Sequence, residues 1–324
     1  MLSSLACRNS KQIKSKKMKV LVATEKPFAA VAVKGIREIV ENAGHKFVAL
    51  EKYTDQKELL KAVKDADALI VRSDKVTADV VNAAKNLKIV VRAGAGYDNL
   101  DLDALSAAKV VAMNTPGQNS NAVAELAVSF MVYMSRNQYT PATGSELKGK
   151  TLGVQAYGNV GRLVANIAKG FGMNIMAFDP FIPAEKIEAD GVKVASSLEE
   201  LYSSSNFISL HIPVTPQTKG SIGYALLSRM PKGGCLVNTA RKEVINEAEL
   251  VKVLTEREDL KYITDIAADN QAELNEKFGV RVFATPKKMG AQTSEANINA
   301  GLAAARQICD FFATGNTRFQ LNRF

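Results

Sequence analysis

Short apolar runs alternate with amphipathic segments along the chain from Met18 onward. The runs are apolar throughout rather than at every second position, which is typical of strands in a parallel sheet covered on both faces. The pattern predicts strands at 19–23, 46–50, 68–72, 88–92 and 110–113, with helices at 29–43, 55–64, 77–85 and 102–108 between them. This alternation predicts a first compact α/β unit that ends near Pro116.

The second half of the chain repeats this theme after a long helix. That helix, from 119 to about 136, is apolar on more than one face, which favours burial between domains or subunits. Further strands are expected at 152–154, 173–178, 207–210, 235–238, 262–265 and 282–284, with helices that include 159–170, 246–256 and 294–313. The chain is therefore predicted to be an α/β protein with two doubly wound parallel-sheet domains. Its active site is expected in the cleft between them, past the carboxyl ends of the strands.

A glycine-rich turn follows the first strand of this second half. Its sequence is Ala156-Tyr-Gly-Asn-Val-Gly161, it leads into a helix, and the next strand ends at Asp179. Strand, turn, helix, strand and acid are the parts of a dinucleotide-binding βαβ unit. The turn backbone approaches the pyrophosphate, the helix N-terminus favours its charge, and the acid accepts from the ribose hydroxyls. A carboxylate at 179 repels a 2′-phosphate, so NAD is favoured over NADP. Ala156 replaces the first glycine of the pattern, which is acceptable only if it keeps a negative φ.

Composition adds limits rather than an activity. The 324 residues suggest two domains, and 47% hydrophobic with 23% charged residues is ordinary for a globular protein with a core. No apolar run is long enough to span a membrane, so no membrane partner is expected. Cys7, Cys235 and Cys309 have no motif spacing, which indicates a reducing compartment and no metal site. A cytoplasmic location is therefore expected.

The net charge of +9 comes largely from the N-terminus. Residues 1–17 hold five basic residues and no acid, so residues 18–324 carry +9 − 5 = +4. This basic N-terminal extension is expected to be disordered, with Met18 as the start of the fold, although its composition also resembles an organelle transit peptide. It lacks interleaved aromatic residues, so no nucleic-acid partner is expected.

Three arginines lie at or just after strand ends, where α/β folds place ligands. Arg72, with Ser73 behind it, follows 68–71, Arg92 closes 88–92, and Arg241 follows 235–238. Arginine forks match carboxylate and phosphate groups. Any one of these residues alone would more often be a surface ion-pair partner, but their shared placement predicts an anionic small-molecule substrate.

Several segments together resemble the D-isomer-specific 2-hydroxyacid dehydrogenases. They include Arg72-Ser-Asp-Lys-Val-Thr77, Arg92-Ala-Gly-Ala-Gly-Tyr-Asp-Asn-Leu-Asp101, Asn114-Thr-Pro-Gly-Gln-Asn-Ser120 with Ala124-Glu125, Phe178-Asp-Pro-Phe181, His211-Ile-Pro-Val-Thr-Pro-Gln-Thr218 and Val237-Asn-Thr-Ala-Arg241. The similarity covers about residues 18–314, and the first three segments are most like the phosphoglycerate-oxidising members. The resemblance implies two Rossmann-like domains, with a substrate-binding domain at 18–116 plus 294–324 and an NAD-binding domain at 117–293. It also implies a homodimer formed through the long helix. Because the chain ends at Phe324, it resembles a short form without the C-terminal regulatory domain.

The resemblance also implies roles for individual residues. Arg241 would polarise the substrate carbonyl and hold its carboxylate. The anionic ends of the substrate would be surrounded by Arg72, Ser73, Arg92, Gly94, Asn119 and Ser120. NAD would contact Gly158, Asn159, Val160, Gly161, Asp179, His211, Pro213, Thr218, Ala240 and Asp265.

The chain departs from the family at the acid/base group. The family uses a histidine in a Thr-Pro-His-x-Gly segment, oriented by a glutamate, whereas this chain has Thr285-Pro-Lys-Lys-Met-Gly290. Alignment back from Gly290 places Lys288 on the histidine position, and alignment forward from Pro286 gives Lys287. Lys288 is preferred, and Asp269 is the nearest substitute for the glutamate. A protonated lysine is a competent acid for reduction, whereas an unperturbed ammonium with a pKa of about 10.4 is a poor base for oxidation.

The function implied by the resemblance is NAD-dependent oxidation of D-3-phosphoglycerate to 3-phosphohydroxypyruvate, the entry to serine synthesis, with a lysine in place of the histidine. One alternative is a glyoxylate or hydroxypyruvate reductase, which needs fewer cations. The other is a non-catalytic NAD-sensing scaffold, which the missing histidine and Ala156 favour.

Overall fold

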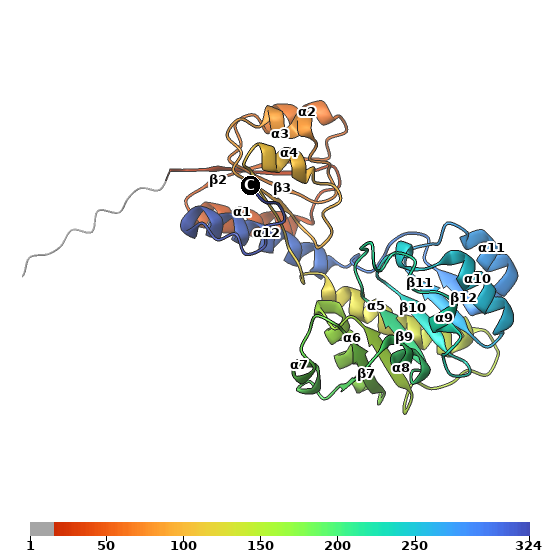
Figure 1. The fold of residues 1–324 in the computed structure, drawn as a ribbon. Coiled ribbons are helices and arrows are strands. Elements are labelled where there is room, and N and C mark those ends of the chain that lie inside the picture. The colour runs from red at the N-terminus through yellow and green to blue at the C-terminus, as the bar shows by residue number, and fades with distance from the viewer. Residues whose placement is uncertain (1–15) are drawn as a thin grey trace, which may run out of the picture. The chain divides into compact units, whose positions relative to one another are not determined.

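The computed structural model describes residues 16–324. Most of the predicted basic extension at 1–17 lies outside this described part. The chain divides into two compact units. The first combines residues up to Pro116 with Asn297–Phe324, and the second is Gly117–Ala296 (Figure 1).

The first unit contains a parallel sheet of order β2-β1-β3-β4-β5. Its strands are β1 (Lys19–Thr24), β2 (Lys46–Glu51), β3 (Ala68–Val71), β4 (Ile89–Arg92) and β5 (Val111–Asn114). The helices are α1 (Ala30–Asn42), α2 (Gln56–Ala62), α3 (Ala78–Ala83), α4 (Leu102–Ala107) and most of α12 (Ser294–Thr314). One face of the sheet packs on α1 and α12 and the other on α2, α3 and α4. The strand order reverses between β1 and β3, which makes the carboxyl ends of these strands the expected ligand site.

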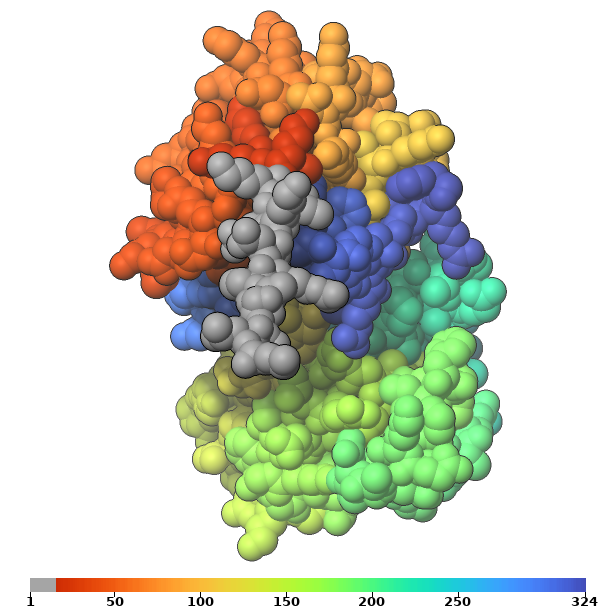
Figure 2. All heavy atoms as spheres, turned by 90° about the vertical axis from the view of Figure 1, so that its left-hand side faces the viewer, coloured from red at the N-terminus to blue at the C-terminus, as the bar shows by residue number. Residues whose placement is uncertain are grey.

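Helices from the two ends of the chain pack closely in this unit. A Cβ atom at Gly35 of α1 would lie 2.6 Å from Cδ2 of Leu302 in α12, and one at Gly301 would lie 2.9 Å from Cδ1 of Ile36. Figure 2 shows the blue C-terminal segment beside the red and orange N-terminal elements. Beyond α12, Asn322 bonds to the start of β5: its Oδ1 accepts from the Ala112 N–H and its Nδ2 donates to the Val110 carbonyl, both at 2.9 Å. The first unit is thus completed by the last residues of the chain.

The second unit contains a larger parallel sheet, of order β12-β11-β10-β9-β6-β7-β8. The strands are β6 (Thr151–Gln155), β7 (Asn174–Phe178), β8 (Lys193–Val194), β9 (Phe207–Leu210), β10 (Cys235–Asn238), β11 (Lys261–Thr264) and β12 (Val282–Ala284). The helices are α5 (Ser120–Ser135), α6 (Asn159–Gly170), α7 (Ala184–Glu188), α8 (Leu198–Ser203), α9 (Tyr224–Leu227), α10 (Glu247–Glu256) and α11 (Gln271–Phe278). The order reverses between β6 and β9, as in a Rossmann sheet.

These sheets confirm the predicted fold class, because every pairing between the described strands is parallel. The predicted strands and longer helices form within a residue or two of their expected limits. The pattern missed β8, α7, α8, α9 and α11, which are short or polar and so carry little periodic signal. None of the helices in the described part combines the length and the apolar character that crossing a membrane requires.

Candidate active site

The glycine-rich turn lies at the carboxyl end of β6, where α6 begins with Asn159. A Cβ atom at Gly161 would lie 2.2 Å from the carbonyl oxygen of Ala156, so the helix approaches the strand as closely as glycine allows. A Cβ atom at Gly158 would meet nothing within 4 Å. Open space at Gly158 and close helix packing at Gly161 are what a pyrophosphate on the helix N-terminus requires.

Ala156 corrects one expectation. It was acceptable in this turn only with a negative φ, but its φ is +74°. The turn therefore needs the left-handed conformation here, in which a Cβ atom crowds the backbone. The Ala156 N–H donates to the Phe178 carbonyl at 2.9 Å, a contact that holds the strained residue against β7.

Asp179 follows β7 and is tied to the same turn. Its Oδ2 accepts from the Tyr157 N–H and its Oδ1 from the Phe181 N–H, each at 2.8 Å. The carboxylate is therefore fixed beside the residues that precede α6, where the sequence predicted it would meet a ribose.

Three further predicted cofactor residues, His211, Pro213 and Thr218, follow β9. The His211 N–H donates to the Gln155 carbonyl at 3.0 Å, and its Nε2 lies 2.9 Å from Oγ of Ser209. Burial lowers the pKa of His211 to about 3, so its ring is neutral at physiological pH. Thr218 donates through Oγ1 to the Pro213 carbonyl at 2.5 Å, which closes the loop after the strand.

Asp265 is a fully buried carboxylate just beyond β11. Its Oδ2 accepts from the Gly290 N–H at 2.7 Å and the Met289 N–H at 3.3 Å, while Oδ1 is buried without a hydrogen-bond partner. Burial raises the pKa of Asp265, against the lowering effects of the Gly290 N–H and of the charges on Lys288 and Arg241. An unpartnered buried acceptor of this kind is a candidate ligand contact.

The loop with both lysines is held from inside the unit. Oγ1 of Thr285 contacts the Lys287 carbonyl at 2.7 Å and the Asp265 carbonyl at 3.0 Å, and Gly290 fits beside Oδ2 of Asp265 only because it lacks a side chain. Both lysines are exposed. Lys288 is the one whose charge acts on Asp265.

Arg241 and Asp269 have local partners. Nη1 of Arg241 donates to the Ala240 carbonyl at 2.8 Å, and Nδ2 of Asn238 donates to the Arg241 carbonyl at 3.0 Å. Asp269 is ion-paired with Lys242 and its side chain is 78% exposed. The structure thus places Asp269 against Lys242, whereas Asp269 was expected to orient a catalytic lysine.

Asn119 and Ser120 lie where α5 begins. Asn119 is the N-cap residue without a side-chain capping bond, and Ser120 is buried. The structure places both in the second unit, whereas the four other predicted substrate residues belong to the first.

In the first unit, Arg72 and Arg92 meet at the carboxyl ends of β3 and β4. Nε of Arg92 donates to the Arg72 carbonyl at 3.0 Å. Gly94 makes room for the Arg92 guanidinium, and its own N–H donates to Oγ1 of Thr115 at 2.7 Å. Ser73 lies next to Arg72 in the same loop.

Sequence reasoning missed the residues that support this pair of guanidinium groups. Asp74 is buried and accepts from the N–H groups of Arg72 and Glu25, and Nδ2 of Asn99 donates to the Arg72 carbonyl at 3.3 Å. Nη2 of Arg72 donates to Oδ1 of Asn297 at 2.6 Å. Asp74 and Asn99 lie inside the recognised segments, but Asn297 lies in α12, and no local pattern connects it with Arg72.

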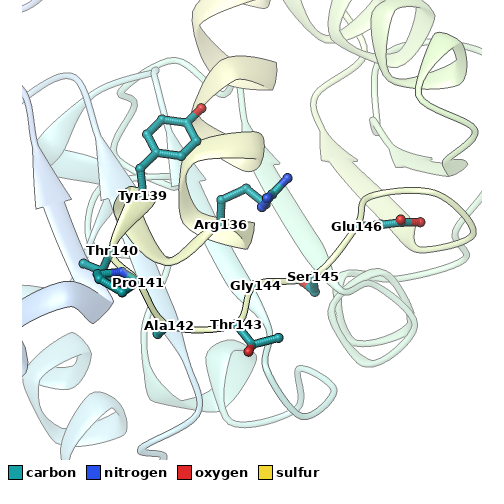
Figure 3. A pocket seen from close by; sticks show the side chains of 9 residues that line it. All are labelled: Arg136, Tyr139, Thr140, Pro141, Ala142, Thr143, Gly144, Ser145 and Glu146. Atoms are coloured by element: carbon teal, nitrogen blue, oxygen red, sulfur yellow. The ribbon is translucent and has the colours of Figure 1, made fainter.

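A pocket of about 540 Å³ lies elsewhere in the second unit, along the segment after α5 (Figure 3). Its lining runs from Arg136 to Glu146 and includes none of the predicted site residues. Asn137, Gln138 and Tyr139, which precede most of this lining, all have positive φ. Among the described residues, no group of His, Cys, Asp and Glu side chains could hold a metal ion.

The fold and the turn at Gly158 define a dinucleotide-binding α/β protein. The family model for the D-isomer specific 2-hydroxyacid dehydrogenase, NAD binding domain, matches residues 127–287. The chain is 51% identical to an NAD⁺-bound 3-phosphoglycerate dehydrogenase of Entamoeba histolytica, over 95% of this chain and 100% of that one, with a TM-score of 0.84. It is also 37% identical to a D-3-phosphoglycerate dehydrogenase of Methanocaldococcus jannaschii, over 90% of this chain and 57% of that protein. A hydroxypyruvate reductase of Thermotoga maritima is 35% identical over 79% of this chain and 88% of its own length.

This chain belongs to the D-isomer-specific 2-hydroxyacid dehydrogenase family, as its motifs predicted. Its second unit contains the NAD-binding domain of the family. The chain spans 51–57% of the length of several curated phosphoglycerate dehydrogenases that it matches.

Proposed function

We propose that this protein is an NAD-dependent dehydrogenase that oxidises D-3-phosphoglycerate to 3-phosphohydroxypyruvate. The observation that carries the proposal is the pair of guanidinium groups at the ends of β3 and β4, because a phosphorylated 2-hydroxy acid has an anionic group at each end. The similarity to phosphoglycerate dehydrogenases supports the same substrate. In this proposal the first unit, from Met18, binds substrate and the second binds NAD.

The residues of the second unit fit NAD. Open space at Gly158 suits the pyrophosphate, Asp179 the adenosine ribose, and the unpartnered Oδ1 of Asp265 an amide donor of the nicotinamide. Asn159, Val160, His211, Pro213, Thr218 and Ala240 would complete the contacts. NAD supplies the hydride acceptor when it is bound.

We assign the acid/base role to Lys288 rather than to Lys287. Lys288 acts electrostatically on Asp265 and is held in place because Asp265 binds the next two N–H groups of its loop. The charge of Arg241 also acts on Asp265, which supports placing the substrate carbonyl near these residues. The contact of Asp269 with Lys242 makes Asp265 the better candidate for the carboxylate that positions the lysine.

The proposed reaction uses these residues as follows. The neutral amine of Lys288 takes the proton of the substrate hydroxyl as the C2–H bond breaks and its electron pair leaves as hydride. The C2–O bond becomes a carbonyl, and Arg241 hydrogen-bonds its oxygen and the neighbouring carboxylate. In the reverse direction the ammonium returns the proton to the oxygen as hydride adds to C2.

The proposal is tested by following NADH formation with D-3-phosphoglycerate. Lys288→Ala should lower kcat by at least about a hundredfold, because it removes proton transfer. Lys287→Ala, which removes the same charge one residue away, should change kcat less than about threefold. Arg241→Ala should lower kcat/KM strongly. Equal turnover for wild type and Lys288→Ala, with Arg241→Ala inactive, would disprove the lysine assignment.

The Thermotoga maritima relative makes hydroxypyruvate reduction the second candidate activity. Wild-type turnover of hydroxypyruvate or glyoxylate with NADH, but none of the phosphorylated substrate in either direction, would favour it. Binding of NADH without turnover of any 2-hydroxy or 2-oxo acid would instead favour a non-catalytic NAD-sensing scaffold.

We also propose a cytoplasmic homodimer. The resemblance of α5 to the dimerising arm of the family supports this assembly. Light scattering of the purified protein at working concentration should give twice the mass of the chain, and a monomer mass would refute it.

A further inference from the structure

The guanidinium of Arg72 donates its hydrogen bonds to neutral groups. Nη1 donates to the carbonyls of Lys26 at 3.1 Å and Pro27 at 3.0 Å, and Nη2 donates to Oδ1 of Asn297 at 2.6 Å. Its central carbon also lies 5.1 Å from the centroid of the Phe28 ring. No carboxylate of the described residues forms an ion pair with this arginine.

Neutral acceptors orient a guanidinium without cancelling its charge, which an ion pair with a carboxylate would largely do. The contacts above leave Nε and one N–H of Nη2 for a ligand. Arg72 is half-buried, and this burial lowers its pKa against the smaller opposing effect of the charge on Asp74, whose carboxylate contacts Arg72 only at its backbone N–H. The group stays protonated because its ordinary pKa is far above neutral. It is therefore a rigid, partly desolvated cation.

The backbone of Arg72 is fixed from the other side. Oδ2 of the buried Asp74 accepts from the Arg72 N–H at 3.2 Å, and Oδ1 of Asp74 accepts from the hydroxyl of Tyr53 at 2.9 Å. Nε of Arg92 and Nδ2 of Asn99 also bind the backbone of Arg72, since both donate to its carbonyl. The direction of the Arg72 side chain is therefore set mainly by the hydrogen bonds of its guanidinium. Asn297 makes the shortest of these.

We propose that Asn297 is a positioning residue and a determinant of anion affinity, which aims Arg72 at the phosphate or carboxylate of the substrate while leaving its charge available. This inference rests on the proposed function for the identity of the substrate. The amide is essential to it, because aspartate has nearly the same shape but would add a charge that pairs with Arg72.

The test compares Asn297→Asp, Asn297→Ala and Asn299→Asp. Asn299 lies in the same helix, is exposed, and gives a matched change of charge away from Arg72. Asn297→Asp should raise KM for D-3-phosphoglycerate about tenfold or more, with kcat within about twofold and NADH affinity unchanged. Asn297→Ala should raise KM less, because Arg72 keeps its charge. Asn299→Asp should behave as wild type.

Thermal melting separates this role from a structural one. Asn297→Asp should melt no lower than Asn297→Ala, because it retains an acceptor for Arg72, although it binds substrate less well. If Asn297 had only a structural role, the melting temperature and the affinity for substrate would fall together. Equal KM values for Asn297→Asp and Asn299→Asp would overturn the proposal, whether both match wild type or both exceed it.

Direct calorimetric titration with inorganic phosphate and with D-3-phosphoglycerate separates this inference from the proposed function. If wild type does not turn over phosphoglycerate but Asn297→Asp alone weakens anion binding, the positioning role holds and the proposed activity fails. If wild type turns over phosphoglycerate while every variant binds these anions equally, the activity holds and the inference fails. Absence of anion binding to wild type would also overturn it.

Discussion

The guanidinium of Arg92 occupies the space that a side chain at Gly94 would need, since Nη1 of Arg92 lies 1.5 Å from the position of a Cβ atom there. Gly94 also has a φ of +144°, which L side chains rarely adopt. Gly94→Ala should therefore displace Arg92 from the Arg72 carbonyl. We expect KM for the anionic substrate to rise about tenfold or more, while NADH affinity stays as in wild type.

Gly149 gives a matched control, because it also has a positive φ but a Cβ atom there would meet nothing within 4 Å. Gly149→Ala should cost backbone strain of about 1 kcal/mol without changing KM. An unchanged KM in Gly94→Ala would show that the position of Arg92 does not matter for the substrate.

Ala156→Gly should stabilise the protein. Its φ of +74° costs an alanine about 1–2 kcal/mol, and glycine relieves this strain at the expense of a more flexible unfolded chain. The net gain should be about 0.5–1 kcal/mol in the free energy of unfolding, measured by urea titration.

An alanine in a helix gives a control in which substitution by glycine should lower the stability. Ala272 of α11 is exposed, and Ala272→Gly should cost about 1 kcal/mol. A loss of stability in Ala156→Gly equal to that in Ala272→Gly would show that the turn is not strained.

The pH dependence of turnover should lack an imidazole ionisation. His211 stays neutral above pH 3 to 4 because burial lowers its pKa to about 3, and His45 lies in the first unit against Phe312. A base that is a lysine must lose a proton before it can accept one, so kcat/KM for oxidation should rise with pH beyond the range in which an ordinary imidazole titrates, about 6.5.

Lys288→His tests the same assignment from the other direction. If this variant retains activity, the rising limb of its kcat/KM profile against pH should move down toward about pH 6.5–7. Lys287→His should leave the wild-type profile unchanged. A wild-type limb near pH 6.5 would exclude Lys288 as the base.

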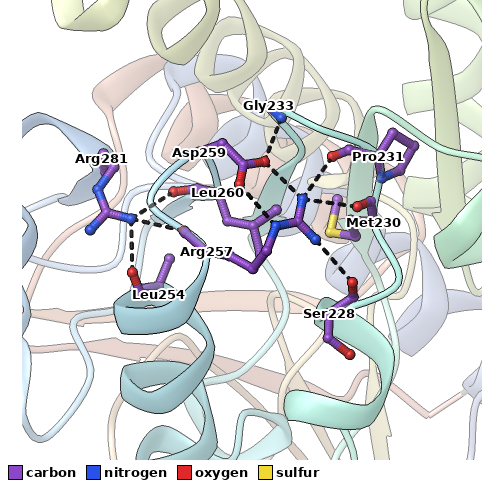
Figure 4. Close-up of polar contacts among 9 residues, drawn as sticks. All are labelled: Ser228, Met230, Pro231, Gly233, Leu254, Arg257, Asp259, Leu260 and Arg281. Atoms are coloured by element: carbon purple, nitrogen blue, oxygen red, sulfur yellow. Dashed lines mark hydrogen bonds and ion pairs between the residues drawn. The ribbon is translucent and has the colours of Figure 1, made fainter.

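The Arg257 side chain ties the segment after α9 to the loop after α10 (Figure 4). Its Nε and Nη2 bind both oxygens of Asp259 at 2.8 and 2.7 Å, and its other N–H groups donate to the carbonyls of Ser228 and Met230. Both side chains of the ion pair are about three-quarters buried. Arg257→Met should therefore cost about 2 kcal/mol of unfolding free energy at pH 7, whereas Met at the exposed Arg229 should cost under about 0.5 kcal/mol.

The unfolding free energy lost in Arg257→Met should decrease as the pH falls. The hydrogen bond from Arg257 is the main cause that holds the pKa of Asp259 well below its ordinary value of 3.8. The stabilisation is thus complete above that ordinary value and is lost as pH falls toward the folded-state pKa. The difference between wild type and Arg257→Met should shrink below about pH 4. A constant difference from pH 7 to pH 3.5 would assign it to the carbonyl contacts instead.

The sequence predicted the parts of this protein that depend on local pattern. Apolar runs set the strands, and Gly158, Gly161 and Asp179 mark the nucleotide turn, because a turn and a strand end are encoded by neighbouring residues. The positive φ of Ala156 was not predictable from the local pattern, because it results from the close packing of α6 on β6, where Gly161 meets the Ala156 carbonyl.

Partners distant in the chain were also outside the reach of pattern. Asp269 and Lys242 are separated by all of α10 and β11, and Arg72 and Asn297 by most of the sequence. A residue type at a strand end indicates which chemistry is available, but the partner that orients or neutralises it is chosen by tertiary structure. This is why the arginines were found and Asn297 was not.

The division of the chain has a consequence for its synthesis. Gly117–Ala296 is continuous, so every strand of the second sheet has left the ribosome before α12 is complete. The first sheet, although made earlier, lacks α12, which covers one face together with α1, and the Asn322 contacts that fix β5. The first sheet is thus made first but completed last, and until then this apolar face is covered by α1 alone.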